Sequence, residues 1–369
     1  MVEAMTTGLT PERYGVLDRL RGVAALLVAL YHCARVGTPQ LVPSGFLAVD
    51  FFFMLSGFVI AHAYQHRLEK GMPLGWFMVL RLVRLMPVVV IASAMGAVYL
   101  ILRWLASPED SDPLWMIAGS SVINAALLPK PWIGPVSGGA LFPGNGPLWS
   151  LFFEVIINAV WAIWLIRARV AVLAVLVGTA AIIFGAISVA SGTTSIGWEW
   201  ASFVGGLVRV TFGFGLGVLI YRLGLAPKIT SRWTSLLALP ALVAALMLPV
   251  QSVWWQIGLV LIVLPAILIA GAVNIGPSRV DEYLGRLSYP LYGVHVPIIF
   301  VSGGTVSIIA PSYDGAPLIF LSVAFSVLFA AIVLKLYDEP LRAFLMDKVR
   351  ARRDSRVAAP TSEAAARVS

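Results

Sequence analysis

The sequence predicts an all-α integral membrane protein of about ten transmembrane helices with both termini in the cytoplasm, and three observations lead to this prediction. Of the 369 residues, 59% are hydrophobic and only 12% are charged, whereas a soluble domain is about 45–50% apolar and about 25% charged. The apolar residues form runs of about twenty, the length that a helix needs to cross a bilayer. The charges lie mainly between these runs. A soluble enzyme, a disordered chain and a collagen-like fibre are therefore excluded.

The apolar runs can be placed in order along the chain. A polar stretch precedes the first run and no small-residue cleavage site follows it, so we do not interpret it as a signal peptide. We expect a cytoplasmic segment 1–16, a transmembrane domain 17–347 and a disordered tail 348–369. The expected helices lie near 20–37, 45–64, 85–106, 113–129, 147–166, 170–191, 201–221, 233–250, 252–273, 287–310 and 315–336.

The charges of the connecting segments orient these helices, because cytoplasmic loops of membrane proteins are enriched in Lys and Arg. The sides of the connections alternate correctly only if 113–129 does not cross the membrane. We therefore interpret 107–146 as one extracytoplasmic excursion, either fully outside or re-entrant. The net charge of +8 then reflects orientation in the membrane and predicts no nucleic-acid partner. The basic connections are 65–84, 167–169, 222–232 and 279–286, whereas 38–45 is uncharged and 107–112 is acidic.

Ionisable side chains inside the predicted helices form two layers. Each costs about 2.5–3.5 kcal/mol even on lenient insertion scales, so function is the first explanation for them. An inner layer contains Arg21, and His32 lies eleven residues further on the same helix face, about 16.5 Å away. Two layers favour a group carried through the membrane over a soluble substrate processed on one side. The inner layer comprises Arg21, Arg81 and Arg84, and the outer layer comprises His32, Asp50, Glu154 and Arg209.

Each of these residues also has a structural interpretation. The inner arginines can anchor helix ends by the positive-inside rule. His32 can be a core histidine bonded to a carbonyl. Asp50 and Arg209 can form a structural ion pair, and Glu154 can make a structural hydrogen bond.

Three other patterns predict no chemistry. His62 and His66 have the spacing of a metal pair, but without a third ligand we expect a cytoplasmic helix end and no metal. The single cysteine, Cys33, excludes a disulfide framework, and we do not expect it to be catalytic. The glycines of Gly213–Gly217 follow no strand, so close helix packing explains them better than nucleotide binding.

Six segments of the chain have the character of family motifs when they are read in order. They are LDRLRG at 17–22 with His32, DFFFMLSGF at 50–58, RLVR at 81–84, PLWSL at 147–151 with Glu154, SYPLY at 288–292 with His295, and EP at 339–340. Together they resemble the motifs of the membrane acyltransferase family 3, and the resemblance spans nearly the whole chain but lacks the SGNH hydrolase-like domain that some members append. Two positions depart from the family pattern: Arg19 stands where Gly is usual, and no second acid adjoins Glu154.

The resemblance implies transfer of an acyl group, usually acetyl, from cytoplasmic acyl-CoA to a hydroxyl of a glycan or glycosylated molecule. Guanidinium groups suit the CoA phosphates, and a histidine suits a general base or an acyl-histidine nucleophile. The expected site comprises His32, Asp50 and Glu154 as catalytic residues, Arg21, Arg81 and Arg84 for the donor, and Arg209, Trp149, Ser150, Tyr289, Tyr292 and His295 for the oxyanion and acceptor.

The expected partners are acyl-CoA, a glycan or lipid-linked saccharide, and lipid of the bacterial cytoplasmic membrane. The alternative is a transporter or flippase of a glycan or small anionic solute. A transporter would often contain repeated halves, whereas Arg21 and His32 have no counterpart in the second half of the chain. The sequence leaves open the acceptor, the choice between acetyl and succinyl, and the oligomeric state.

Overall fold

The computed structural model describes residues 14–33, 40–225, 232–273, 277–309 and 316–358. These residues form helices joined by short connections, and two isolated β-bridges lie in the loops. Seven of the described helices are long and apolar enough to cross a membrane. The all-α membrane fold is therefore confirmed, whereas ten crossings and two cytoplasmic termini stay predictions.

The described helices correspond to the predicted runs. Three π-helical segments continue or join them: Trp161–Leu165 after α5, Leu259–Val263 between α10 and α11, and Leu334–Asp338 between α13 and α14. The helices are α1 (Gly15–Cys33), α2 (Ala48–Glu69), α3 (Leu74–Ala106), α4 (Leu114–Ala125), α5 (Leu148–Val160), α6 (Val170–Ser191), α7 (Phe203–Arg222), α9 (Arg232–Met247), α10 (Val253–Gly258), α11 (Leu264–Gly271), α12 (Arg279–Ile309), α13 (Ala316–Val333) and α14 (Glu339–Ala358).

Several boundaries differ from expectation; helix α12, for example, begins at Arg279 rather than near 287. Helix α3 begins at Leu74 rather than near 85, so Arg81 and Arg84 lie within a helix and not in the connection before it. The segment before residue 85 alternates arginines with apolar side chains, and Phe77 buries its ring completely. Helix α14 continues to Ala358 through part of the tail expected to be disordered. Its Leu, Ala, Lys and Arg residues are strong helix formers; residues 359–369 lie outside the described part.

Close helix pairs form the frame around the centre of the bundle. Helix α1 packs on α12, and α2 packs on α7. A Cβ atom at Gly57 would overlap the backbone of Phe214, and one at Gly217 would overlap the backbone of Met54. The glycines of α7 thus allow α2 and α7 to touch backbone to backbone, as the packing interpretation predicted.

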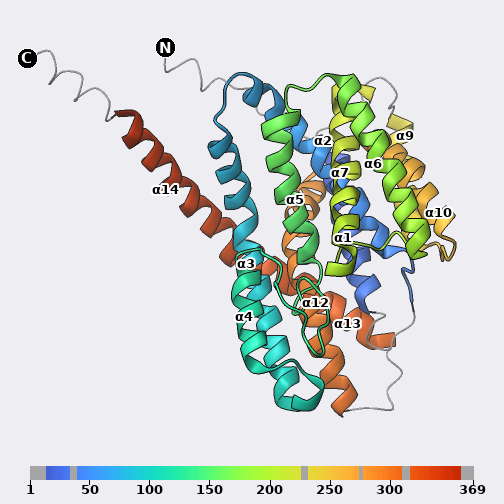
Figure 1. The fold of residues 1–369 in the computed structure, drawn as a ribbon, viewed down its shortest axis with the longest axis vertical. Helices are drawn as coiled ribbons and strands as arrows, with labels where there is room; N and C mark the ends of the chain where they lie inside the picture. The colour runs from blue at the N-terminus through green and yellow to red at the C-terminus, as the bar shows by residue number, and fades with distance from the viewer. Residues whose placement is uncertain (1–13, 34–39, 226–231, 274–276, 310–315, 359–369) are drawn as a thin grey trace, which may run out of the picture.

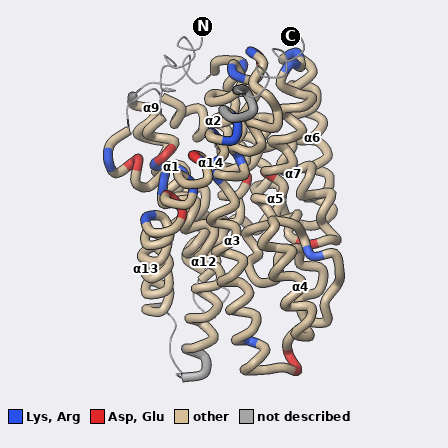
Figure 2. Tube along the Cα trace, turned by 90° about the vertical axis from the view of Figure 1, so that its left-hand side faces the viewer, with Lys and Arg blue, Asp and Glu red and all other residues tan. Residues whose placement is uncertain are grey.

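The ends of the bundle differ in charge. Figure 1 shows the connection between α2 and α3 at the upper end, and α4 with the loop after it toward the lower end. Figure 2 shows most Lys and Arg residues in the upper half of the molecule. Helix α4 has 12 residues and is therefore about 18 Å long, shorter than the ~30 Å hydrocarbon core. This length agrees with the prediction that 113–129 does not cross.

Candidate functional site

The inner arginines meet around a cavity of about 140 Å³ in the bundle. Arg21 reaches it from α1, and Arg81 and Arg84 reach it from one face of α3, because residues three apart are neighbours on a helix surface. Glu154 lines the same cavity from α5. The structure thus brings the three predicted donor residues together and adds a carboxylate to them.

Glu154 belongs to the arginine cavity rather than to the layer of His32. Its Oε1 accepts hydrogen bonds from Arg81 Nη2 at 2.9 Å and from Ser56 Oγ at 2.7 Å. The depth expected by counting from the outer end of the helix differs, because α5 begins inside the bundle. Asn145, three residues before α5, bonds the carbonyls of Ala92 and Gly293 in the middle of α3 and α12.

The cavity carries an excess of positive charge. Three arginines and one glutamate among its lining residues give 3 − 1 = +2. The Nε atoms of Arg21 and Arg81 and the Nη1 of Arg84 are buried and have no hydrogen-bond partner. Each guanidinium also has a carboxylate partner, and these partners are Asp18, Glu154 and Asp338. Buried N–H donors are nevertheless normally paired as well. The cavity is therefore suited to an anionic ligand.

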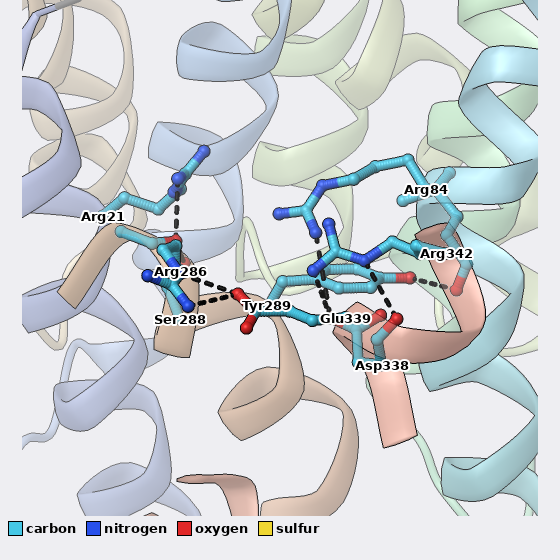
Figure 3. A network of polar contacts seen from close by, with 10 residues as sticks. Arg21, Arg84, Arg286, Ser288, Tyr289, Asp338, Glu339 and Arg342 are labelled. Atoms are coloured by element: carbon cyan, nitrogen blue, oxygen red, sulfur yellow. Dashed lines mark hydrogen bonds and ion pairs between the residues drawn. The ribbon is translucent and has the colours of Figure 1, made fainter. Parts of the chain in front are cut away.

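Asp338, which was not among the expected site residues, lies beside Arg84 and Arg342. Asp338 is fully buried; Arg342 donates to it at 2.6 Å, and Arg84 lies 3.9 Å from the same oxygen. Arg84 also lies over the ring of Tyr289, 5.4 Å from its centroid. Figure 3 shows Arg84 and Arg342 together beside Asp338. The sequence does contain a signal for Asp338, because this carboxylate lies next to the EP motif at the end of an apolar run.

A larger cavity of about 400 Å³ adjoins the first. Arg21 lines both cavities, and Arg286 and His62 line the second. Arg286 is held by Glu339 of the EP motif at 2.7 Å. The second cavity lies among residues from helix ends that the charge pattern predicts to be cytoplasmic. A ligand can therefore occupy both cavities with Arg21 between them.

His32 contacts another histidine. Its Nδ1 lies 2.9 Å from the carbonyl of Val28 and 3.2 Å from His295 Nε2. His295 Nδ1 lies 3.0 Å from the carbonyl of Leu291. A carbonyl only accepts, so both Nδ1 atoms carry the hydrogen in the neutral pair. The single hydrogen of His32 Nδ1 is then shared between the Val28 carbonyl and His295 Nε2, which both accept. His32 Nε2 then holds the lone pair that a base requires.

Asp50 and Arg209 form the buried ion pair that was the structural alternative. Both side chains are 1% exposed, and Arg209 donates from Nε and Nη2 to the two carboxylate oxygens at 2.7 Å each. It also donates to the carbonyls of Ile196 and Phe46 and lies over the Trp149 ring. These contacts tie α2, α7 and the 192–199 segment together. They favour a structural role over orientation of His32 or stabilisation of an oxyanion.

Tyr292 connects the arginine cavity with the histidine pair. Its hydroxyl lies 2.8 Å from Ser150 Oγ, and both residues line the cavity. Ser150 donates to the carbonyl of Pro147, so its oxygen can accept from Tyr292. The rings of Tyr292 and His295 lie 5.9 Å apart. Tyr289 instead donates to the carbonyl of Leu85.

Apolar helices around a buried cationic cavity define a helical membrane protein whose cavity is suited to an anionic ligand. The chain matches the profile of the acyltransferase 3 family, described as an acyltransferase domain, over residues 14–335. It belongs to this family and is a membrane-bound O-acyltransferase. This membership favours the enzyme over the transporter alternative.

One relative and the solved structures complete the comparison. The chain is 41% identical over 166 residues to "Protein 2 in picA locus" of Rhizobium radiobacter, which covers 43% of this chain and 85% of the relative. No solved structure matches the chain.

Proposed function

We propose that this enzyme transfers an acyl group, most simply acetyl, from cytoplasmic acyl-CoA to a hydroxyl of an extracytoplasmic glycan or lipid-linked saccharide, in the bacterial cytoplasmic membrane. The observation that carries the proposal is a cavity whose lining residues have a net charge of +2 and whose three guanidinium groups each keep one buried N–H donor without a hydrogen-bond partner. In an acyltransferase, the donor is the substrate that brings negative charge to such a site.

The donor would extend across both cavities. CoA carries three phosphate groups at one end and a thioester at the other, joined by a narrow pantetheine arm. The 400 Å³ cavity suits the nucleotide end, and the three arginines of the 140 Å³ cavity suit the phosphates where the arm begins. Arg21 lies where the two adjoin, and its guanidinium can bind phosphate oxygens with two parallel hydrogen bonds. The thioester then points toward Tyr292 and the histidine pair.

His32 would act as the general base. Its Nε2 takes the proton of the acceptor hydroxyl while the hydroxyl oxygen attacks the thioester carbonyl. The tetrahedral intermediate collapses with cleavage of the C–S bond, and His32 returns the proton to the departing CoA thiolate. No net proton is gained or lost. The Tyr292 hydroxyl lines the cavity and would turn its hydrogen from Ser150 Oγ to the developing oxyanion.

His295 would take the place that the sequence analysis gave to a carboxylate. Its Nε2 accepts from His32 Nδ1–H, which holds the imidazole of the base in one tautomer and supports the imidazolium formed during attack. Asp50 and Glu154 are each occupied by an arginine instead. Glu154 would then be a positioning residue for Arg81.

Purified enzyme in proteoliposomes with acyl-CoA and surface glycan provides the test. Release of free CoA should depend on the glycan, and mass spectrometry of the glycan should show the added ester, with the mass increment distinguishing acetyl from succinyl. The same assay with His32→Ala is the control. CoA release without esterified glycan would refute the proposed acceptor, and no release with any acyl-CoA would refute the donor.

A further inference from the structure

Helix α4 has its polar side toward the protein and its apolar side outward. Ser120 and Asn124, with Ile117, form the buried side. The opposite side contains Leu114, which is 47% exposed, and Val122, which is 73% exposed. A surface helix in water has the reverse arrangement. The segment 114–128 also has no charged residue, so α4 lacks the features of a helix exposed to water.

The far end of α4 lies beside the interior of α3. Ser121 and Asn124 line a small cavity together with Gly96 of α3. Gly96 is ten residues from the end of α3 at Ala106, which corresponds to about 15 Å along the helix. Helix α4 therefore returns along α3 for about 15 Å, and Figure 1 shows the two side by side.

The near end of α4 has the features of a membrane interface. Asp112, two residues before the helix, accepts hydrogen bonds from the backbone N–H groups of Val136 and Ser137 at 2.8 and 3.2 Å. Trp115 lies beside Trp132, with ring centroids 6.0 Å apart. Tryptophan is enriched at the boundary between lipid and water. The Asp112 anchor and the tryptophan pair thus fix the depth at which α4 enters the membrane.

The loop that follows α4 is compatible with membrane depth because protein surrounds it. Gly144 approaches Gly96 so closely that a Cβ on either would clash with the other backbone. Asn145 donates at 2.7 Å to the carbonyl of Gly293, which has no helical partner because Pro297 lacks an N–H group. Irregular backbone is tolerated at this depth when its polar groups are satisfied inside protein.

We propose that residues 114–147 form a re-entrant helix and loop, and that the outer face of α4 binds acyl chains of the outer membrane leaflet. The outer half of α3, on which α4 packs, also exposes apolar side chains, among them Leu102 and Leu105. Lipid contact on α3 therefore extends over α4. This inference rests on the membrane fold alone and is independent of the identity of the acyl donor or acceptor.

Nitroxide accessibility tests this inference directly. In a Cys33→Ser background, Val122→Cys carries the test label, Leu102→Cys is the lipid control, and Glu109→Cys is the aqueous control. The proteins are placed in vesicles of phosphatidylethanolamine and phosphatidylglycerol. The label at 122 should match that at 102, with high collision with oxygen and low collision with a soluble nickel chelate. The label at 109 should show the reverse.

Two results would overturn the proposal. Nickel accessibility at 122 equal to that at 109 would place α4 in water. Low accessibility to both reagents would place another protein surface, such as a second copy, against it. Cys33 is buried, so the same labels can be attached with Cys33 retained if Cys33→Ser does not fold.

Discussion

The contact between His32 and His295 determines which nitrogen of each ring is available for chemistry. Both Nδ1 atoms face carbonyls of the preceding helical turn, at 2.9 Å from Val28 and 3.0 Å from Leu291. The ring of His32 therefore presents Nε2 as the basic nitrogen when it is neutral. A histidine in this arrangement can replace the carboxylate of a catalytic triad as the acceptor of the Nδ1 hydrogen, although it adds no negative charge.

We expect His32→Ala to reduce acyl transfer by about 10²–10⁴-fold, because it removes the general base. Expression and membrane insertion should remain normal, since the side chain is only partly buried. The measurement is glycan-dependent CoA release in proteoliposomes. Activity equal to wild type would exclude His32 as the base.

The role of His295 can be separated from simple packing by two substitutions. His295→Gln keeps an acceptor near His32 Nδ1, whereas His295→Leu fills the space without one. We expect the Leu variant to lose kcat with little change in the KM for acyl-CoA, and the Gln variant to recover much of the loss. Equal kcat values for the two variants would show that His295 acts only by filling space.

The cavity arginines should bind the donor through charge-assisted hydrogen bonds. Arg84→Ala is the sharpest test, because Arg342 still pairs with Asp338 in its absence. We expect acyl-CoA binding to weaken by about 1.5–3 kcal/mol, roughly 10- to 150-fold in Kd. Arg84→Lys should recover only part of the affinity, since a point charge does not replace a planar fork.

The matched control for Arg84→Ala is Arg103→Ala, an exposed arginine whose side chain bonds the carbonyl of Asp110 far from the cavity. It should leave the Kd for acyl-CoA unchanged. Titration calorimetry with a non-hydrolysable acyl-CoA measures both variants. If Arg21→Ala, Arg81→Ala and Arg84→Ala all leave the affinity for acyl-CoA unchanged, these arginines do not bind the donor and serve only to anchor helix ends.

At the scale of helices, the start of α5 explains most of the difference between the predicted and observed site. Hydropathy places a helix at 147–166, and α5 with its π-helical extension occupies that range. Hydropathy does not show that the preceding loop enters the bundle. Depth counted from Leu148 therefore placed Glu154 too far outside. Asn145 gives no periodic signal, because its role depends on a proline 152 residues further along the chain.

The bond from Asn145 to Gly293 can be tested through that proline. Asn145→Ala leaves the Gly293 carbonyl buried without its partner, which should cost about 1–3 kcal/mol and lower the Tm. Pro297→Ala restores an N–H group that can donate to the same carbonyl. We expect the double variant to be more stable than Asn145→Ala alone. A decrease in Tm of the double variant that equals the sum of the two single decreases would contradict this role of the bond.

The anchor of the 107–147 segment should depend on pH. Burial raises the pKa of Asp112, but hydrogen bonds from Ser137 and Val136 outweigh it and hold the pKa below its usual value. The carboxylate is the form that accepts these bonds, so the anchor is intact above the usual pKa and is lost as pH falls through the lowered pKa.

A nitroxide at Ile133 reports this change. Its mobility should increase only at strongly acidic pH in the wild-type background, and it should be high at every pH in Asp112→Ala. A mobility transition near neutral pH would contradict the role of Asp112.

At the scale of the whole molecule, composition and hydropathy were sufficient to predict the fold class. The order of apolar runs and the family motifs also located the three cavity arginines and His32. Composition, hydropathy and motifs do not predict which of these residues contact one another. The contacts Arg81–Glu154 and His32–His295 join helices far apart in the chain, and Asp338 lies next to the EP motif but is not part of it.

The predicted topology has a direct measurement. In a Cys33→Ser background, single cysteines at Ser111, Ser137 and Ser195 should react with an impermeant reagent from outside intact cells. A cysteine at Ser278 should react only after permeabilisation. Protection of Ser137 while Ser111 reacts would show that 113–129 crosses, and would reverse the orientation of α5.

Sided proteoliposomes test the central claim most directly, since they separate the donor from the acceptor across one membrane. Radiolabelled acetyl-CoA is enclosed on the side of Arg21 and Arg286, and the glycan is added on the other side. The account predicts labelled glycan outside and free CoA inside for the wild-type enzyme, and neither for His32→Ala. Labelled glycan formed only when donor and acceptor share one side would contradict transfer through the bundle.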